Sequence, residues 1–171
     1  MATGGTDDTD NDDIGWKFIR SGFQRAEFLP EHELNAQVFE FQAQDLGERK
    51  KAFVRLSLTD IMMAGVQLIE PGGGENTLHS HAGQDGFYFV LEGRVHFYGE
   101  GDVLLADLGK HQGIVIPRGF KYWLMAAGDK QAHLLQISAF DRSTANTHTA
   151  HGPPAKRENT YGILLLDGRK G

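Results

Sequence analysis

The stretch IMMAGVQLIEPGGGENTLHSHAGQDGFYFVLEGRVHFY, residues 61–98, decides the fold class of this chain. It contains four short runs rich in apolar, aromatic and β-branched residues, and glycine-containing turns separate them. Runs of this kind, bounded by such turns, are typical of β-strands. They cover Ile61–Ile69, Thr77–His81, Phe87–Leu91 and Arg94–Tyr98.

The same pattern continues on both sides of this stretch. Ala36–Phe41 and Phe53–Leu58 alternate with a period of two, as half-buried strands do. Later runs of the same character are Val103–Leu105, Ile114–Ile116, Tyr122–Met125, His133–Phe140 and Tyr161–Leu166. Short strands with turn signals about every 8–12 residues predict an all-β sandwich or barrel. A helix is expected only around Leu29–Leu34, and it would be short.

The composition excludes several function classes. The chain has 171 residues, the size of one domain. Five Asp residues near the N-terminus supply five of its six net negative charges, so the rest lacks the clustered basic charge of nucleic-acid-binding proteins. Because the chain has no Cys, disulfides, thiolate zinc sites and a Cys nucleophile are excluded. There is neither an apolar run of about 18 residues nor a signal peptide, so we expect a cytoplasmic protein without a membrane partner.

Two histidines carry the strongest chemical signal. His79 and His81 are two residues apart in an expected strand, so their imidazoles project from the same face. Two neutral imidazoles side by side can hold a transition-metal ion. Without further context, two surface histidines on a solvated strand would be the more frequent explanation of such a pair.

The surroundings of this pair resemble a known family. Gly73, five further residues, His79-Ser80-His81 and then a run ending at Gly93 resemble the first motif of the cupin superfamily. Pro117-Arg118-Gly119 resembles the Pro-x-Gly of its second motif. The resemblance covers residues 61–140. It implies a double-stranded β-helix barrel, similar to a jelly roll, with one divalent first-row metal ion inside. Fe(II) is favoured for this site, with Zn, Mn or Ni as alternatives.

The chain is expected to divide into four parts. Residues 1–13 are rich in Gly, Thr, Asn and Asp and predict a disordered acidic tail. Residues 14–60 form an N-terminal strand extension, residues 61–140 the barrel, and residues 141–171 a polar loop followed by a final strand that packs on the barrel. Exposed strand edges must be covered, and in cupins such N-terminal strands commonly join the partner's sheet. We therefore expect a homodimer.

The carboxylate ligand of the cupin pattern has no clear counterpart. Counted back from Gly93, it falls on Gly86, which has no side chain. Counted forward from His81 with the shorter spacing, it falls on Asp85, and a β-bulge at Gly86 would turn Asp85 inward. With the two histidines, Asp85 would form the two-histidine, one-carboxylate set of non-haem iron sites. Gln84 is the backup as a neutral oxygen ligand, and the alternative is that residues 84–86 are only a polar turn.

The last family ligand, a histidine after Pro-x-Gly, is Tyr122 here. An unperturbed phenol titrates at about 10, so we expect a hydrogen-bonding or acid–base role, with metal ligation or an aromatic wall as alternatives. By strand parity Tyr88 faces the same cavity as position 86, which makes Tyr88 and Tyr122 the candidate catalytic residues. Among the other histidines, His111 in a Gly-flanked turn is the reserve ligand, and His148 in the polar tail is expected at the surface.

Two function classes follow from these residues. The first is a metalloenzyme whose ion keeps positions open for substrate, either a dioxygenase or a Lewis-acid isomerase, lyase or cyclase. Its substrate would be a small apolar, aromatic or carboxylate-bearing molecule. The second is a non-catalytic cupin that binds a small ligand and has a degenerate metal site. The retained His79-Ser80-His81 favours the first class, with oxygenase chemistry preferred, and bound metal discriminates between the two.

Overall fold

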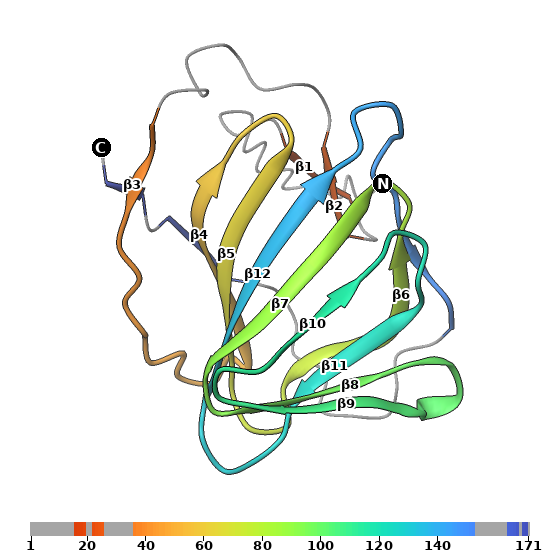
Figure 1. Ribbon diagram of the computed structural model, residues 1–171. Helices are drawn as coiled ribbons and strands as arrows, with labels where there is room; N and C mark the ends of the chain where they lie inside the picture. Colours follow the sequence, from red (N-terminus) through yellow and green to blue (C-terminus); the bar gives the residue numbers. More distant parts are fainter. Residues whose placement is uncertain (1–15, 20–21, 26–35, 153–163, 168, 171) are drawn as a thin grey trace, which may run out of the picture.

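The computed structural model describes residues 16–19, 22–25, 36–152, 164–167 and 169–170 (Figure 1). The expected tail, residues 1–13, and the helix expected at Leu29–Leu34 lie outside these residues. The described part of the chain consists of strands, loops and one 3₁₀ turn, Glu100–Asp102. No helix in this part is long and apolar enough to cross a membrane.

The strands are β1 (Trp16–Ile19), β2 (Gly22–Arg25), β3 (Val38–Phe39), β4 (Lys51–Leu58), β5 (Met62–Ile69), β6 (Gly74–His81), β7 (Gln84–Glu92), β8 (Arg94–Tyr98), β9 (Leu104–Gly109), β10 (Gly113–Ile116), β11 (Tyr122–Ala126), β12 (Ala132–Phe140), β13 (His148–Ala150), β14 (Leu164–Asp167) and β15 (Arg169–Lys170).

Two sheets form the body of the protein. A six-stranded sheet has the order β10-β7-β12-β5-β4-β14, and a five-stranded sheet has the order β13-β6-β11-β8-β9 (Figure 1). Their strands pair antiparallel except β14, which runs parallel to β4. Two ribbons, β1–β2 and β3–β15, complete the described strands. The predicted fold class, an all-β double-stranded β-helix, is confirmed.

The main core lies between the two sheets. Strand alternation turns Tyr88 and Val90 of β7 inward, and Phe97 of β8 and Leu124 of β11 meet them from the opposite sheet. All four side chains have no exposed surface. Removal of this apolar surface from water is the main stabilising term of the barrel.

A second apolar cluster covers the other face of β4 and β5. It contains Leu46, Val54 and Leu68, with Phe41 packed against it. The two strands pair with each other and so belong to the chain's own six-stranded sheet. The homodimer expected from the N-terminal strands stays a prediction.

Strand β6 lies between β13 and β11. Its first residue, Gly74, has φ +156°, and a Cβ there would lie 2.2 Å from the Leu124 carbonyl oxygen. Only glycine allows β6 to begin this close to β11. Further along β6, His79 pairs with Tyr122 of β11 and His81 pairs with His148 of β13.

The polar segment after Phe140 departs from its prediction as a loop. Residues His148–Ala150 form β13 and pair with β6. The backbone bonds from Ala82 N to Thr147 O, 3.1 Å, and from His151 N to Leu78 O, 2.7 Å, continue the pairing at both ends. The free edge of β6 offers backbone hydrogen-bond donors and acceptors to this segment. The segment therefore forms a strand although its side chains are mostly polar. Farther along, β14 contains the described part of the expected final strand and pairs with β4.

Replacement of a core leucine tests the two-sheet core. Leu134 of β12 is fully buried in it, so Leu134→Ala is expected to lower the free energy of unfolding by about 2–5 kcal/mol. The matched control is Leu104→Ala on the edge strand β9, where the side chain is 50% exposed and the cost should stay below about 1 kcal/mol. Urea denaturation measures both. Equal decreases in the free energy of unfolding of the two variants would contradict a core located between the two sheets.

Candidate metal centre

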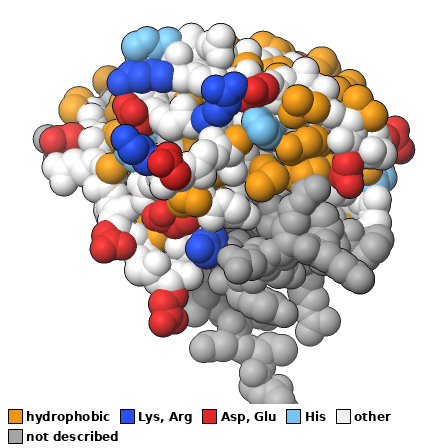
Figure 2. All heavy atoms as spheres, turned by 90° about the horizontal axis from the view of Figure 1, so that it is seen from below, with side chains coloured by type: hydrophobic (Ala, Val, Ile, Leu, Met, Phe, Trp, Pro, Cys, Tyr) orange, Lys and Arg blue, Asp and Glu red, His pale blue; other side chains and the backbone are white. Residues whose placement is uncertain are grey.

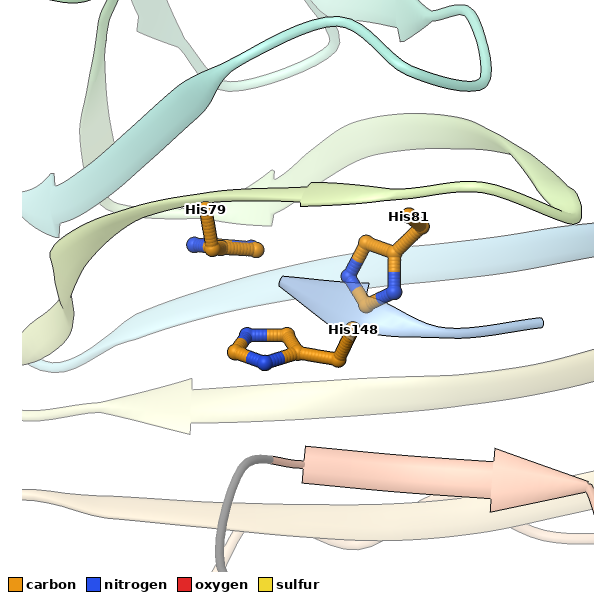
Figure 3. A group of neighbouring side chains, drawn as sticks. All are labelled: His79, His81 and His148. Carbon is orange, nitrogen blue, oxygen red and sulfur yellow. The ribbon is translucent and has the colours of Figure 1, made fainter. Parts of the chain in front are cut away.

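Three histidines meet at the paired strands β6 and β13 (Figure 3). His79 and His81 extend from β6 on the same face, and His148 extends from β13 opposite His81. One nitrogen of each ring lies within 4.8 Å of one nitrogen of each of the others. The rings of His79 and His148 are nearly stacked, with centroids 4.9 Å apart. The antiparallel pairing therefore adds a third imidazole to the pair predicted from sequence.

The donor atoms of this group fit a metal ion. Nδ1 of His81 and Nδ1 of His148 are buried and have no hydrogen-bond partner in the described part of the chain. A buried ring nitrogen without a hydrogen-bond partner lowers the stability of the folded state, and ligation of a metal ion is one way to give it a partner. Burial and the proximity of His79 lower the pKa of His81 to about 3 and that of His148 to about 4. Both rings are thus neutral at pH 7, the form that binds metals.

His79 differs from the other two because both of its nitrogens have neighbours. Nδ1 donates to the Thr77 carbonyl oxygen at 2.8 Å, an acceptor that fixes the ring orientation. Nε2 lies 3.3 Å from Oε2 of Glu75, four residues earlier on the same strand. A backbone carbonyl bound to one ring nitrogen is the usual support for a metal-ligating histidine.

Glu75 brings a negative charge to the group. Its Oε1 accepts from Nζ of Lys51 at 2.6 Å and from Nε2 of Gln67 at 3.2 Å. Burial opposes the ionisation of Glu75, but the Lys51 ammonium and the hydrogen bond with His79 outweigh it and hold the pKa well below its usual range. An ionised carboxylate is therefore held next to the histidines by a buried ammonium group.

The structure does not bring Asp85 to the histidines. The bulge expected at Gly86 is absent, because β7 pairs with β12 without a register shift from Gln84 to Phe89. Asp85 therefore stays on the outer face, where its carboxylate forms an ion pair with Arg118 at 3.0 Å. The backbone N–H of Arg118 also donates to it at 2.8 Å. These bonds to Arg118 explain why its pKa is lowered, and they correct the predicted inward orientation.

Gln84 lies on the inner face of β7, as parity requires, and is buried. Its Oε1 accepts a hydrogen bond from Nδ2 of Asn146 at 2.9 Å. Together with His81 and Tyr122 it lines a small cavity of about 10 Å³. The structure also shows that residues 84–86 belong to a strand and are not a polar turn.

Two buried tyrosines fill the space beside the histidines. The hydroxyl oxygens of Tyr88 and Tyr122 are 2.6 Å apart and share a hydrogen bond. The ring of Tyr122 lies 4.4 Å from that of His79, centroid to centroid. Gly86 makes room for this arrangement, because a Cβ there would lie 2.8 Å from the Tyr88 ring. Burial raises the pKa of both phenols above their ordinary value, so both are neutral.

A surface groove of about 320 Å³ lies near this group. Its walls include the apolar side chains of Val103, Leu105 and Phe120, together with Lys121, whose Nζ is 2.7 Å from Oε1 of Glu100. Phe120 also lines the small cavity that contains His81 and Tyr122. One aromatic side chain thus borders both the groove and the cavity at the histidines.

Sequence reasoning missed His148 and Glu75. His148 follows a polar stretch with no apolar alternation, so only the pairing of β13 with β6 reveals it. The β-branched residues Thr147 and Thr149 on either side of it were a weak strand signal. Glu75 lies on β6 with the same parity as His79 and His81, and that parity could have indicated it. The reserve candidate His111 lies elsewhere, stacked on Phe89 with centroids 6.3 Å apart.

Comparisons with known proteins concern the fold that holds this group. Residues 65–138 match the family model described as a cupin domain. No curated protein matches the chain. An uncharacterised double-stranded β-helix protein from Klebsiella pneumoniae superposes with a TM-score of 0.54 at 12% identity, over 64% of this chain and 90% of that one.

Two further solved structures show the same fold. A cupin-like protein from Thermotoga maritima gives a TM-score of 0.51 at 22% identity, over 66% of this chain and 92% of that one. An oxalate oxidase in complex with the substrate analogue glycolate gives 0.50 at 18% identity, over 66% and 64% of the two chains. At these identities the likeness concerns the fold.

Removal of the third imidazole tests the composition of the group. His148→Ala should weaken the binding of Zn²⁺ to the metal-free protein at least about 10-fold, because a ligand is lost. The control His111→Ala removes a histidine that lies outside the group and should leave the dissociation constant unchanged. Calorimetric titration measures both variants. Wild-type affinity in His148→Ala would remove His148 from the ligand set.

Proposed function

The chain belongs to the cupin superfamily, and we propose that it is a metalloenzyme with one divalent first-row metal ion bound by His79, His81 and His148. The observation that carries this proposal is the pair of buried Nδ1 atoms, on His81 and His148, that have no partner in the described residues. Both belong to neutral imidazoles at pH 7, which suit Fe, Zn, Ni or Cu.

Fe(II) is the ion we favour, and a dioxygenase or related oxidoreductase is the class of reaction. When bound, such an ion supplies Lewis acidity and, for iron, redox chemistry with dioxygen. A few protein ligands leave positions open for substrate, and this separates catalytic from structural sites. Zn or Mn in the same position would support an isomerase, lyase or cyclase instead.

The tyrosine pair supplies a proton donor next to this centre. Only one of the two hydroxyls donates within the Tyr88–Tyr122 hydrogen bond, so the other keeps a proton to donate. Both phenols are neutral, which retains that proton at pH 7. Tyr122 borders the cavity at His81 and is therefore the member of the pair that we place against the substrate.

The groove at Phe120 supports a substrate with an apolar or aromatic part. Val103, Leu105 and Phe120 present apolar surface there, and the one lysine of its lining already pairs with Glu100. Arg94 and Arg118, which could pair with a substrate carboxylate, are paired as well: Arg94 with Asp107 and Arg118 with Asp85. On the face drawn in Figure 2, Lys and Arg side chains lie beside Asp and Glu side chains. This pairing favours the apolar alternative over the carboxylate-bearing one.

A non-catalytic ligand-binding cupin is the second candidate, and one observation favours it. The Tyr88 ring occupies the space beside Gly86, where the family pattern has a carboxylate ligand, and Tyr122 stands where it has a histidine. In that case the groove at Phe120 would hold a small ligand without a metal. Metal content separates the two candidates.

Elemental analysis of tag-free protein tests the proposal. We expect one first-row metal ion per chain in the wild type and none in the His79→Ala/His81→Ala double variant. Chelation should lower the melting temperature, because an ion at 100 times its dissociation constant adds about 2.7 kcal/mol to the folded state. If the protein binds no metal on reconstitution, and its melting temperature changes with neither metal nor chelator, the metalloenzyme proposal is wrong. The ligand-binding candidate then remains.

Tyr122→Phe separates proton donation from metal binding, since it removes only the hydroxyl. Metal content should persist, while turnover falls by the roughly 10²–10⁴-fold that a general acid–base group contributes. Dioxygen consumption by Fe(II)-loaded protein with a panel of small apolar and aromatic molecules identifies the substrate for this comparison. Loss of metal in the variant would instead make Tyr122 a ligand. Unchanged metal and turnover would make it a wall of the cavity.

A further inference from the structure

The contact between His79 and Glu75 brings together two atoms that each offer a lone pair when the ring is neutral. The Thr77 carbonyl oxygen can only accept, so Nδ1 of His79 carries the ring hydrogen in that 2.8 Å bond. In a neutral ring, Nε2 then presents a lone pair to Oε2 of Glu75, 3.3 Å away. The Glu75 carboxylate forms an ion pair with Nζ of Lys51 at 2.6 Å, and in that charged form it offers only lone pairs as well. A contact of this kind requires a shared cation between the two atoms, either a proton or a metal ion.

The two oxygens of Glu75 have different surroundings. Oε1 is held by Lys51 at 2.6 Å and by Gln67 at 3.2 Å, whereas Oε2 turns toward the His79 ring. Lys51 is itself buried, with 5% of its side chain exposed, so the ammonium group is committed to this carboxylate. Metal-ligating carboxylates are usually held in this manner, with one oxygen hydrogen-bonded and the other directed to the ion.

The separation of 3.3 Å between Nε2 and Oε2 also fits two atoms bound to one metal ion. Nitrogen and oxygen ligands lie about 2.0–2.2 Å from such an ion. Neighbouring ligand atoms at tetrahedral or octahedral angles are therefore about 2.8–3.6 Å apart. The observed distance lies within this interval.

We propose that Glu75 is a ligand of the metal centre, with Oε2 bound to the ion that His79 binds through Nε2. The inference rests on the proposed function and adds to it an oxygen ligand from within β6, four residues before His79. Lys51 and Gln67 are then positioning residues, because they hold the carboxylate through Oε1. The centre would combine imidazoles with one carboxylate, the donor set for which Asp85 was considered.

The competing arrangement has a proton in the same position, which makes His79 and Glu75 a simple ion pair. It gives Glu75 no direct bond to the metal. Metal-binding measurements with the tag-free chain distinguish the two arrangements, and Co²⁺ is the probe because its absorption spectrum reports its ligands.

Glu75→Gln is the decisive variant, since it keeps the size of the side chain and removes the charge. We expect its dissociation constant for Co²⁺, measured by chelator competition, to rise by at least about 10–100-fold. We also expect the Co²⁺ spectrum to shift. The matched control is Glu92→Gln, at an exposed carboxylate paired with Lys110, and it should bind Co²⁺ as the wild type does. A Glu75→Gln variant with wild-type affinity and spectrum would overturn the inference.

A second variant guards against a loss of folding in Glu75→Gln, which leaves Lys51 buried without its partner. Glu75→Asp keeps the charge for Lys51 but withdraws the oxygens by one methylene group. Its metal-free form should unfold at nearly the wild-type temperature, yet it should show the weakened binding of Co²⁺. Glu75→Asp with wild-type binding and an unshifted spectrum would overturn the inference.

A crystal structure of the Zn²⁺-loaded wild type measures the distance from Oε2 of Glu75 to the ion directly. A distance of about 2.0–2.2 Å supports the inference, and an Oε2 atom outside ligand distance overturns it even if affinity falls in Glu75→Gln. Failure of this inference is distinct from failure of the proposed function. If Glu75→Gln binds Co²⁺ normally while His148→Ala does not, the histidine centre stands and only the Glu75 ligand is lost. A wild type that binds no Co²⁺ overturns both.

Discussion

The antiparallel pairing of β6 with β13 on one side and with β11 on the other is the constraint on which the candidate metal centre depends. It aligns His148 with His81 and Tyr122 with His79. Each partner comes from a part of the chain far from the histidine pair in sequence. The close approach of β6 to β11 in turn requires Gly74, where a side chain would meet the backbone of Leu124.

Electrostatics divides this interior into two kinds of environment. On one side, burial keeps His81 and His148 neutral, and their unpartnered nitrogens suit a metal ion. On the other side, the buried Lys51 keeps Glu75 ionised although desolvation opposes it. The neutral imidazoles would supply ligand atoms to a metal ion between them and the carboxylate. The carboxylate of Glu75 would offset part of the ion's positive charge.

Local pattern was sufficient to predict much of this arrangement from sequence. Short runs of apolar, aromatic and β-branched residues between turns marked most of the barrel strands, and strand parity placed Tyr88 inward beside position 86. Asp85 was harder, because its predicted inward orientation required a bulge, and the regular register to β12 together with Arg118 keeps it outside. His148 could not be predicted, because its position depends on a long-range backbone pairing that leaves almost no trace in its own segment.

Anomalous diffraction at the absorption edge of the bound metal tests the central claim most directly. Crystals of the tag-free protein, loaded with Fe(II) or Zn²⁺, would locate the ion independently of any activity. We expect one anomalous peak per chain, among the ring nitrogens of His79, His81 and His148. A peak elsewhere, for example at the paired His96 and Asp107, or loaded crystals without a peak at the three histidines, would contradict it.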